Sequence, residues 1–185
     1  MKKYFLEYRA FLVFLAKFFL SYLILALIYQ AYLGQFDAAK FEIDAFTQFV
    51  SDQTVGVISW LDSAVMQRPN VREASTNILF HDQIIARIVE GCNALSIMIL
   101  FVAFLISFTG TFKNTLLFGL AGILIIHIFN IARIALLVIA IYYYPASTAL
   151  LHDIIFPLVI YGIVFLLWLV WINKFSFYAT KNTAK

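Results

Sequence analysis

Four long apolar runs dominate this chain, and they restrict it to folds that cross a lipid bilayer. The runs cover about residues 10–33, 92–111, 115–143 and 154–172, each close to the roughly 20 apolar residues that a spanning helix needs. Only 12% of the residues are charged and 64% are hydrophobic, unlike the composition of soluble domains. We therefore expect an all-α integral membrane protein with about four transmembrane helices, organised as one membrane domain over residues 1–185.

Residues 34–91 form the long polar segment between the first two runs, and charged residues interrupt it too often for a fifth span. Apolar residues recur at helical spacing near Phe46 and again near Trp60, which predicts amphipathic helices at the outer membrane interface. Pro69 is expected to end the second helix, because the residue before a proline avoids helical angles. Residues 78–89 are then expected to lead back into the membrane.

Basic residues predict the orientation of the chain, since short cytoplasmic loops carry an excess of Lys and Arg. One side of the four spans receives Lys2, Lys3, Arg9, Lys113, Lys174, Lys181 and Lys185. We therefore expect both termini in the cytoplasm and residues 34–91 on the opposite face. The first run has a basic start like that of a signal peptide but is too long for one, so we expect a retained anchor.

Cys92, Arg133 and His152 stand at matching positions in or beside the last three apolar runs. Counting 1.5 Å per helical residue from the cytoplasmic ends places them roughly 31, 27 and 31 Å above those ends. The hydrocarbon layer is about 30 Å thick, so a thiol, a guanidinium and an imidazole are expected in one layer near its outer boundary. Equal depth alone does not predict that the three side chains face one another.

These three residue types suit a thiol active site. Cys92 is the chain's only cysteine, so it is either a small packing residue or a reactive group. The guanidinium of Arg133 would stabilise a thiolate or an oxyanion, and the imidazole of His152 would act as base and then as acid. Two structural roles also stay open: Arg133 in an ion pair or snorkelling to the interface, and His152 as an interfacial anchor.

Other polar residues stand close to these three. We expect four supporting residues: Asn130, Asn93, Glu90 and Asp153. Asn130 lies one helical turn before Arg133 and is placed to hold its guanidinium by a hydrogen bond. His81 and Asp82 are an alternative base pair outside the spans, and His127 is expected to pack. We expect no metal and no cofactor, because the histidines lack ligand spacing and there is no cysteine cluster.

Three motifs occur in a fixed order: Glu90-Gly91-Cys92-Asn93 opens one span, Asn130-Ile131-Ala132-Arg133 lies late in the next, and His152-Asp153 opens the last. This order resembles the exosortase and archaeosortase family over residues 87–171. The four-span build is similar to compact exosortases such as type F. The chain departs from many members at Ala94, where they have glycine, and this bears on the subtype and on the motif that is recognised.

The resemblance implies a membrane-embedded cysteine protease or transpeptidase at the outer face of the bacterial inner membrane. In the family, the positions similar to Cys92, Arg133 and His152 form the catalytic triad. The implied partners are exported proteins that end in a PEP-CTERM-like sorting signal, made of a short motif, a transmembrane helix and a basic tail. An acceptor amine or water would receive the cleaved protein, and membrane lipid would surround the enzyme.

Two other classes of function remain open. A non-enzymatic assembly factor or accessory subunit of an export complex would explain the hydropathy equally well, but it gives no reason for three reactive side chains at one depth. A small transporter would place Arg133 on a permeation route, but the four spans lack repeat symmetry. We expect no nucleic-acid partner, because the basic residues behind the net charge of +3 flank the spans and form no patch.

Overall fold

The computed structural model describes residues 8–108 and 110–176, and its contacts divide the chain into two compact units. We call residues 32–95 and 125–162 the sheet unit, and the remainder of the chain the helical unit. Four of the residues used to orient the chain lie outside the described residues: Lys2, Lys3, Lys181 and Lys185. The organisation of the whole chain as one membrane domain stays a prediction.

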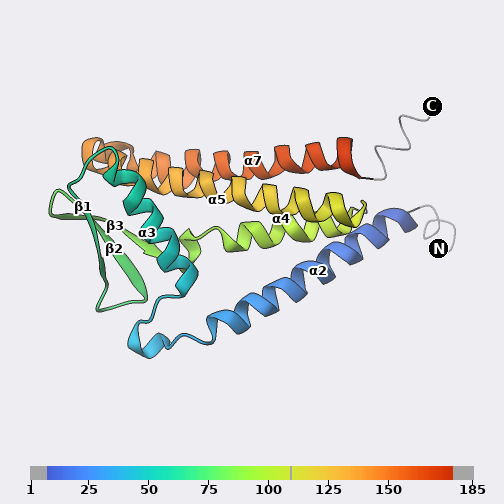
Figure 1. Ribbon diagram of the computed structural model, residues 1–185, viewed down its shortest axis with the longest axis horizontal. Coiled ribbons are helices and arrows are strands. Elements are labelled where there is room, and N and C mark those ends of the chain that lie inside the picture. Colours follow the sequence, from blue (N-terminus) through green and yellow to red (C-terminus); the bar gives the residue numbers. More distant parts are fainter. Residues whose placement is uncertain (1–7, 109, 177–185) are drawn as a thin grey trace. The chain divides into compact units, whose positions relative to one another are not determined.

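Three helical segments are long and apolar enough to cross a bilayer, which confirms the predicted class of helical membrane protein. They are α2 (Arg9–Leu33), α5 (Phe112–Tyr143) and the continuous stretch Pro145–Phe175 (Figure 1). That stretch contains the 3₁₀ turn η3 (Pro145–Ser147), α6 (Thr148–Leu150), the π-helical turn η4 (Leu151–Ile155), α7 (Phe156–Val170) and the π-helical turn η5 (Trp171–Phe175). The fourth apolar helix, α4 (Leu95–Ser107), has only 13 residues and is about 20 Å long.

Aromatic rings pack the helices of the helical unit together. Phe104 of α4 contacts Trp168 of α7 in a stacked arrangement with 4.2 Å between ring centres, and Phe14 of α2 edge-on at 5.9 Å. Gly122 of α5 faces Phe101 of α4 so closely that a Cβ atom there would collide with the ring. Many large apolar side chains of α2 are exposed, as expected for a helix whose surface contacts lipid.

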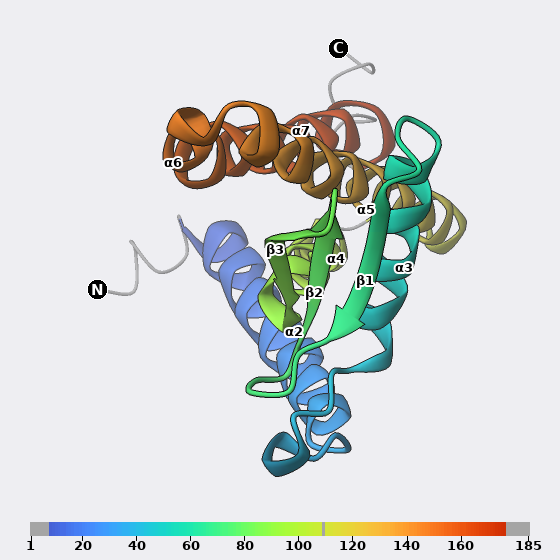
Figure 2. The same ribbon diagram turned by 90° about the vertical axis from the view of Figure 1, so that its left-hand side faces the viewer.

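The sheet unit contains a three-stranded antiparallel sheet that was not predicted. Its strands are β1 (Val65–Pro69), β2 (Ser75–Phe80) and β3 (Gln83–Val89), in the order β1-β2-β3, and Figure 2 shows them beside α3 (Ala45–Ser59). The predicted amphipathic helix near Phe46 corresponds to α3. The predicted second helix near Trp60 is wrong, because α3 ends at Ser59 and residues 65–69 form β1. Residues 78–89 form the end of β2, a turn and β3, which is followed by η2 and the apolar helix α4.

The hairpin between β2 and β3 explains why the sheet was missed. His81 and Asp82 connect the strands and have φ angles of 50° and 62°, as both central residues of a two-residue type I′ turn require. Asn-Gly or Asp-Gly usually supplies these angles, so His-Asp gives no hairpin signal. Without that signal, the apolar and β-branched residues from Ile78 to Val89 are as consistent with a buried helix as with two strands.

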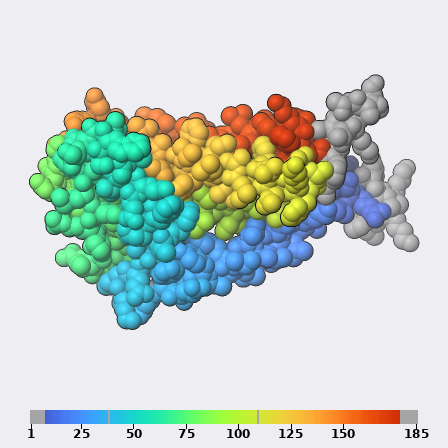
Figure 3. All heavy atoms as spheres, in the orientation of Figure 1, coloured from blue at the N-terminus to red at the C-terminus, as the bar shows by residue number. Residues whose placement is uncertain are grey.

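The core of the sheet unit lies where α3, the strands and the later part of α5 meet. Its buried members are Val50, Ile58, Ile78, Phe80, Ile88, Ile131, Ile134, Ala135 and Val138. In the space-filling view α3 lies at the surface next to the strands (Figure 3). Because β3 and α5 share this core, the end of β3 is fixed relative to the polar residues of α5.

We predict that the hairpin turn tolerates glycine but not a β-branched residue at Asp82. Asp82→Val places a branched side chain at a positive φ, which costs about 1–2 kcal/mol, and should lower the apparent midpoint of thermal unfolding in detergent by a few degrees. Asp82→Gly should leave the midpoint at or above the wild-type value, because glycine adopts this conformation without strain. Equal midpoints for the two variants would contradict the turn assignment.

Candidate active site

Cys92 lies on a short 3₁₀ turn, η2 (Glu90–Cys92), that joins β3 to α4. The predicted span of residues 92–111 is therefore wrong at its start, and the depth counted along a helix does not apply to Cys92, since α4 begins at Leu95. Between them, Ala94 has a φ of 62°, a left-handed conformation that costs residues with a Cβ atom about 1–2 kcal/mol. Glycine avoids that cost, so the backbone at this position favours glycine over the alanine that is present.

A chain of buried hydrogen bonds holds the Cys92 turn against the start of α3. Asn93 donates from Nδ2 to the Thr47 hydroxyl at 2.9 Å, and that hydroxyl donates to the Asp44 carboxylate. Asn93 Oδ1 also accepts from the backbone N–H of Leu95, which satisfies a free donor at the start of α4. The side chains of Asp44, Thr47 and Asn93 are all buried, so breaking this chain would leave polar groups without partners.

Asn130 fixes the same turn from the side of α5. Its Nδ2 donates to the backbone carbonyl of Cys92 at 2.8 Å, and its side chain is 1% exposed. Asn130 was expected to hold the guanidinium of Arg133, but among the described residues no hydrogen bond joins the two, and the described bond of Asn130 goes to Cys92. Since Arg133 lies one turn further along α5, the same helix positions both the thiol-bearing turn and the guanidinium.

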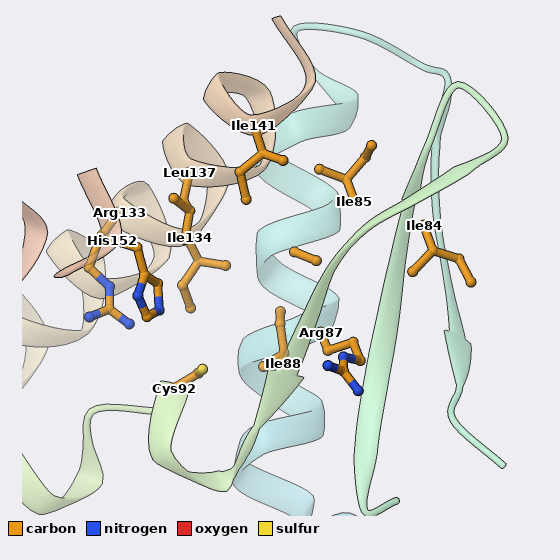
Figure 4. Close-up of a pocket in the computed structure, with 11 residues that line it drawn as sticks. Ile84, Ile85, Arg87, Ile88, Cys92, Arg133, Ile134, Leu137, Ile141 and His152 are labelled. Carbon is orange, nitrogen blue, oxygen red and sulfur yellow. The ribbon is translucent and has the colours of Figure 1, made fainter. Parts of the chain in front are cut away.

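Cys92, Arg133 and His152 line one pocket of about 380 Å³ in the sheet unit (Figure 4). Cys92 and Arg133 are close enough to interact electrostatically, although no hydrogen bond joins any two of the three side chains in the described residues. Arg133 Nε is buried and has no hydrogen-bond partner within the same residues. The pocket therefore brings a thiol, an imidazole and a guanidinium with unused donor capacity to one space.

His152 reaches this pocket from η4, just before α7. Phe156 donates to the carbonyl five residues earlier, and Pro157, which has no N–H, cannot donate to the carbonyl of Asp153. His152 Nδ1 lies 2.6 Å from the Asp153 carboxylate. Because an ionised carboxylate only accepts hydrogen bonds, this contact favours the tautomer with the proton on Nδ1, in which Nε2 keeps a lone pair for proton transfer.

The other predicted polar residues lie away from this pocket. Glu90 lines a different pocket of about 250 Å³ together with Asp44. His81 Nε2 lies 2.9 Å from Asp62 Oδ2. Neither His81 nor Asp82 lines the pocket that contains Cys92, so the alternative base pair is not beside the thiol. A hydrogen bond from the backbone N–H of Ala64 lowers the pKa of the Asp62 carboxyl.

His127 contacts side chains of α3. His127 Nε2 pairs with the Gln53 side chain, and its ring stacks on Phe49, which fits the predicted packing role. Within residues 8–108 and 110–176, no three His, Cys, Asp or Glu residues group as metal ligands would.

Sequence reasoning missed Asp44 and Thr47. Thr47 lies 46 residues before Asn93, in a segment that was expected only to contact the membrane interface. The sequence did indicate a helix start here, because Asp44 before Ala45 and Phe46 is typical of an N-cap residue. That pattern predicts a cap and gives no indication that the same hydroxyl reaches the Cys92 turn.

We predict that Thr47→Val loosens the Cys92 turn. The change keeps the shape but leaves the Asn93 amide without its acceptor, at a cost of about 1–3 kcal/mol. It should lower the apparent midpoint of thermal unfolding and change several-fold the rate at which a maleimide labels Cys92, the only cysteine in the chain. Thr54→Val is the matched control on α3, because the buried Thr54 hydroxyl only donates to the carbonyl of Val50. Equal effects of both variants would contradict a special role for Thr47.

Comparison with known families identifies the chain. Residues 6–174 match the family model described as transmembrane exosortase. No curated protein and no solved structure matches the chain. The matched range covers most of the sequence and includes Cys92, Arg133 and His152. The chain is therefore a multi-pass membrane protein that belongs to the transmembrane exosortase family, a family of membrane-embedded, sorting-related enzymes.

Proposed function

We propose that the chain is a cysteine peptidase or transpeptidase that processes the C-terminal sorting signals of exported proteins. Its substrates would carry a PEP-CTERM-like signal, in which a short motif precedes a transmembrane helix and a basic tail. The active site would face the periplasm at the outer boundary of the bacterial inner membrane. Cys92 would be the nucleophile, Arg133 the stabiliser of negative charge, and His152 the general base and acid.

The pocket lined by Cys92, Arg133 and His152 carries this proposal. A charged residue within a spanning helix is costly unless it is paired or hydrated, and a structural arginine would be expected to have its donors paired. Arg133 Nε lacks a partner in the described part of the chain, and the guanidinium shares its pocket with a thiol. A donor held ready for developing negative charge is what oxyanion stabilisation requires.

The reaction would follow from the geometry of these groups. His152 Nε2 takes the thiol proton, and the thiolate of Cys92 attacks the carbonyl carbon of the cleaved peptide bond. Arg133 stabilises the resulting oxyanion, the C–N bond breaks, and the imidazolium returns its proton to the leaving amine. An acceptor amine or water then attacks the thioester, gives a proton to His152 and releases the thiolate, which regains that proton.

The supporting residues would act by holding these groups in place. Asn130 would hold the Cys92 carbonyl and Asn93 the backbone that follows it, and Asp153 would select the His152 tautomer. Glu90 begins the turn but lines the other pocket, so its effect would be indirect. The subtype of the enzyme and the identity of the acceptor belong to the same proposal.

We predict that Cys92→Ala stops processing while the protein still inserts into the membrane. The reporter substrate is a secreted protein that ends in a sorting segment from the same genome, and processing is measured as conversion of precursor to mature reporter on immunoblots. Ser96→Ala, on the exposed side of α4, is the matched control and should process the reporter at the wild-type rate. Normal conversion by Cys92→Ala would exclude the thiol mechanism and favour an accessory role.

We predict that Arg133→Lys reduces processing at least tenfold. Lysine keeps a positive charge but lacks the planar donor fork of arginine, and losing one oxyanion donor typically costs about 10²–10³ in rate. The measurement is the initial rate of reporter conversion at matched enzyme abundance. Arg68→Lys on β1, which is exposed, should leave the rate unchanged. A normal rate for Arg133→Lys would mean that charge alone suffices and that directed donation is not needed.

A further inference from the structure

Strand β3 is an edge strand whose open side lies next to the candidate active site. It pairs with β2 on one side, and the sheet order β1-β2-β3 gives it no second neighbour among the described strands. Unpaired backbone groups on an edge strand can pair with another extended chain. β3 ends at Val89, and the next three residues form the turn that carries Cys92.

The pocket of Cys92 runs along this edge of the sheet. Five consecutive β3 residues, Ile84 to Ile88, line it together with Cys92, Arg133 and His152. Neighbouring side chains of a strand point to opposite faces, so a cavity lined by five in a row must run along the strand's edge. A register shift opposite Ile78 and Leu79 leaves Ile85 as the extra residue, and such bulges often stand next to active sites.

Another wall of the pocket is an apolar stripe on α5, whose Ile134 shares a buried core with Ile78 and Ile88, so the stripe lies toward one face of the sheet. Ile134, Leu137 and Ile141 line it at the three- and four-residue spacings that place side chains on one helix face. Figure 4 shows this stripe across the pocket from β3. The space therefore offers backbone hydrogen bonds on one side and apolar contact on the other, which is the combination that an extended peptide needs when it adds to a sheet.

We infer that the substrate segment just before the cleaved bond adds to β3 as a fourth strand, parallel to it. This inference rests on the proposed function. The enzyme's own chain runs from β3 through the Cys92 turn into the apolar helix α4. The substrate has the same order, with an extended motif, then the cleaved bond, then an apolar helix. Running in the same direction places its motif along β3 and its cleaved bond beside Cys92.

Strand addition makes side-chain specificity alternate along the substrate. Every second substrate side chain faces the Ile134, Leu137 and Ile141 stripe, so apolar residues are preferred at those positions. The intervening side chains point away from the stripe and contribute less to recognition. Backbone hydrogen bonds to β3 supply affinity that is largely independent of sequence.

Disulfide cross-linking tests this pairing directly. Cys92→Ala removes the only cysteine, so single cysteines can be introduced with Arg87→Cys or Val89→Cys, two exposed β3 positions. The reporter substrate carries one cysteine at each position before the cleaved bond in turn, and cross-linking follows mild oxidation in membranes. We expect efficient cross-links at every second substrate position. Moving the enzyme cysteine from residue 87 to residue 89 should shift the best partner two residues toward the cleaved bond.

The controls separate this inference from the proposed function. Met66→Cys on β1, the opposite edge strand, should give no efficient cross-link, and equal yields there would overturn the inference. Yields without a two-residue period would overturn strand addition, and a shift away from the cleaved bond would overturn the parallel direction. Because cross-linking uses inactive enzyme, these outcomes are independent of whether reporter processing by the wild type requires Cys92.

Discussion

The turn that carries Cys92 depends on the buried side-chain amides of Asn93 and Asn130. Their hydrogen bonds connect the turn to α3, α4 and α5. Between Val89, where β3 ends, and Leu95, where α4 begins, the backbone belongs neither to a ladder nor to an α-helix. Buried backbone groups need partners, above all next to an apolar layer. Asn130 satisfies the carbonyl of Cys92, and Asn93 satisfies the N–H of Leu95. Two amides from different parts of the chain thus stabilise a turn that belongs to no strand and no α-helix.

The same contacts determine which groups can meet. Asn130 and Arg133 are three residues apart on α5, so the helix that holds the Cys92 carbonyl also carries the guanidinium. Because both residues lie in α5, the helix itself fixes the position of Asn130 relative to Arg133. His152 comes from a separate element, where a π-helical turn precedes Pro157. Such turns are frequent at functional sites, and here the distortion has an identifiable cause in the residue that lacks an N–H.

The sequence predicted the parts of this structure that depend on local pattern. The runs of α2 and α5 are long and uniformly apolar, so their spans could be placed within a few residues. Arg133 stood out because a charge within a span needs an explanation. The sheet could not be predicted, since the His81-Asp82 turn has the backbone of an Asn-Gly hairpin without its residues. The role of Thr47 could not be predicted either, because a contact with Asn93 across 46 residues leaves no local pattern.

Under the proposed function, the position of the Cys92 turn also explains which substrate bond is cut. Each peptide N–H within an α-helix donates to the carbonyl four residues earlier. An attacking thiolate would have to break those hydrogen bonds. A substrate that passes from an exported domain into a membrane helix must change from extended to helical near the boundary. The enzyme makes that change with the help of Asn93, Asn130 and the strained Ala94. A substrate at the same depth would lack these hydrogen bonds, so under the proposed function its unpaired peptide groups would be accessible to Cys92.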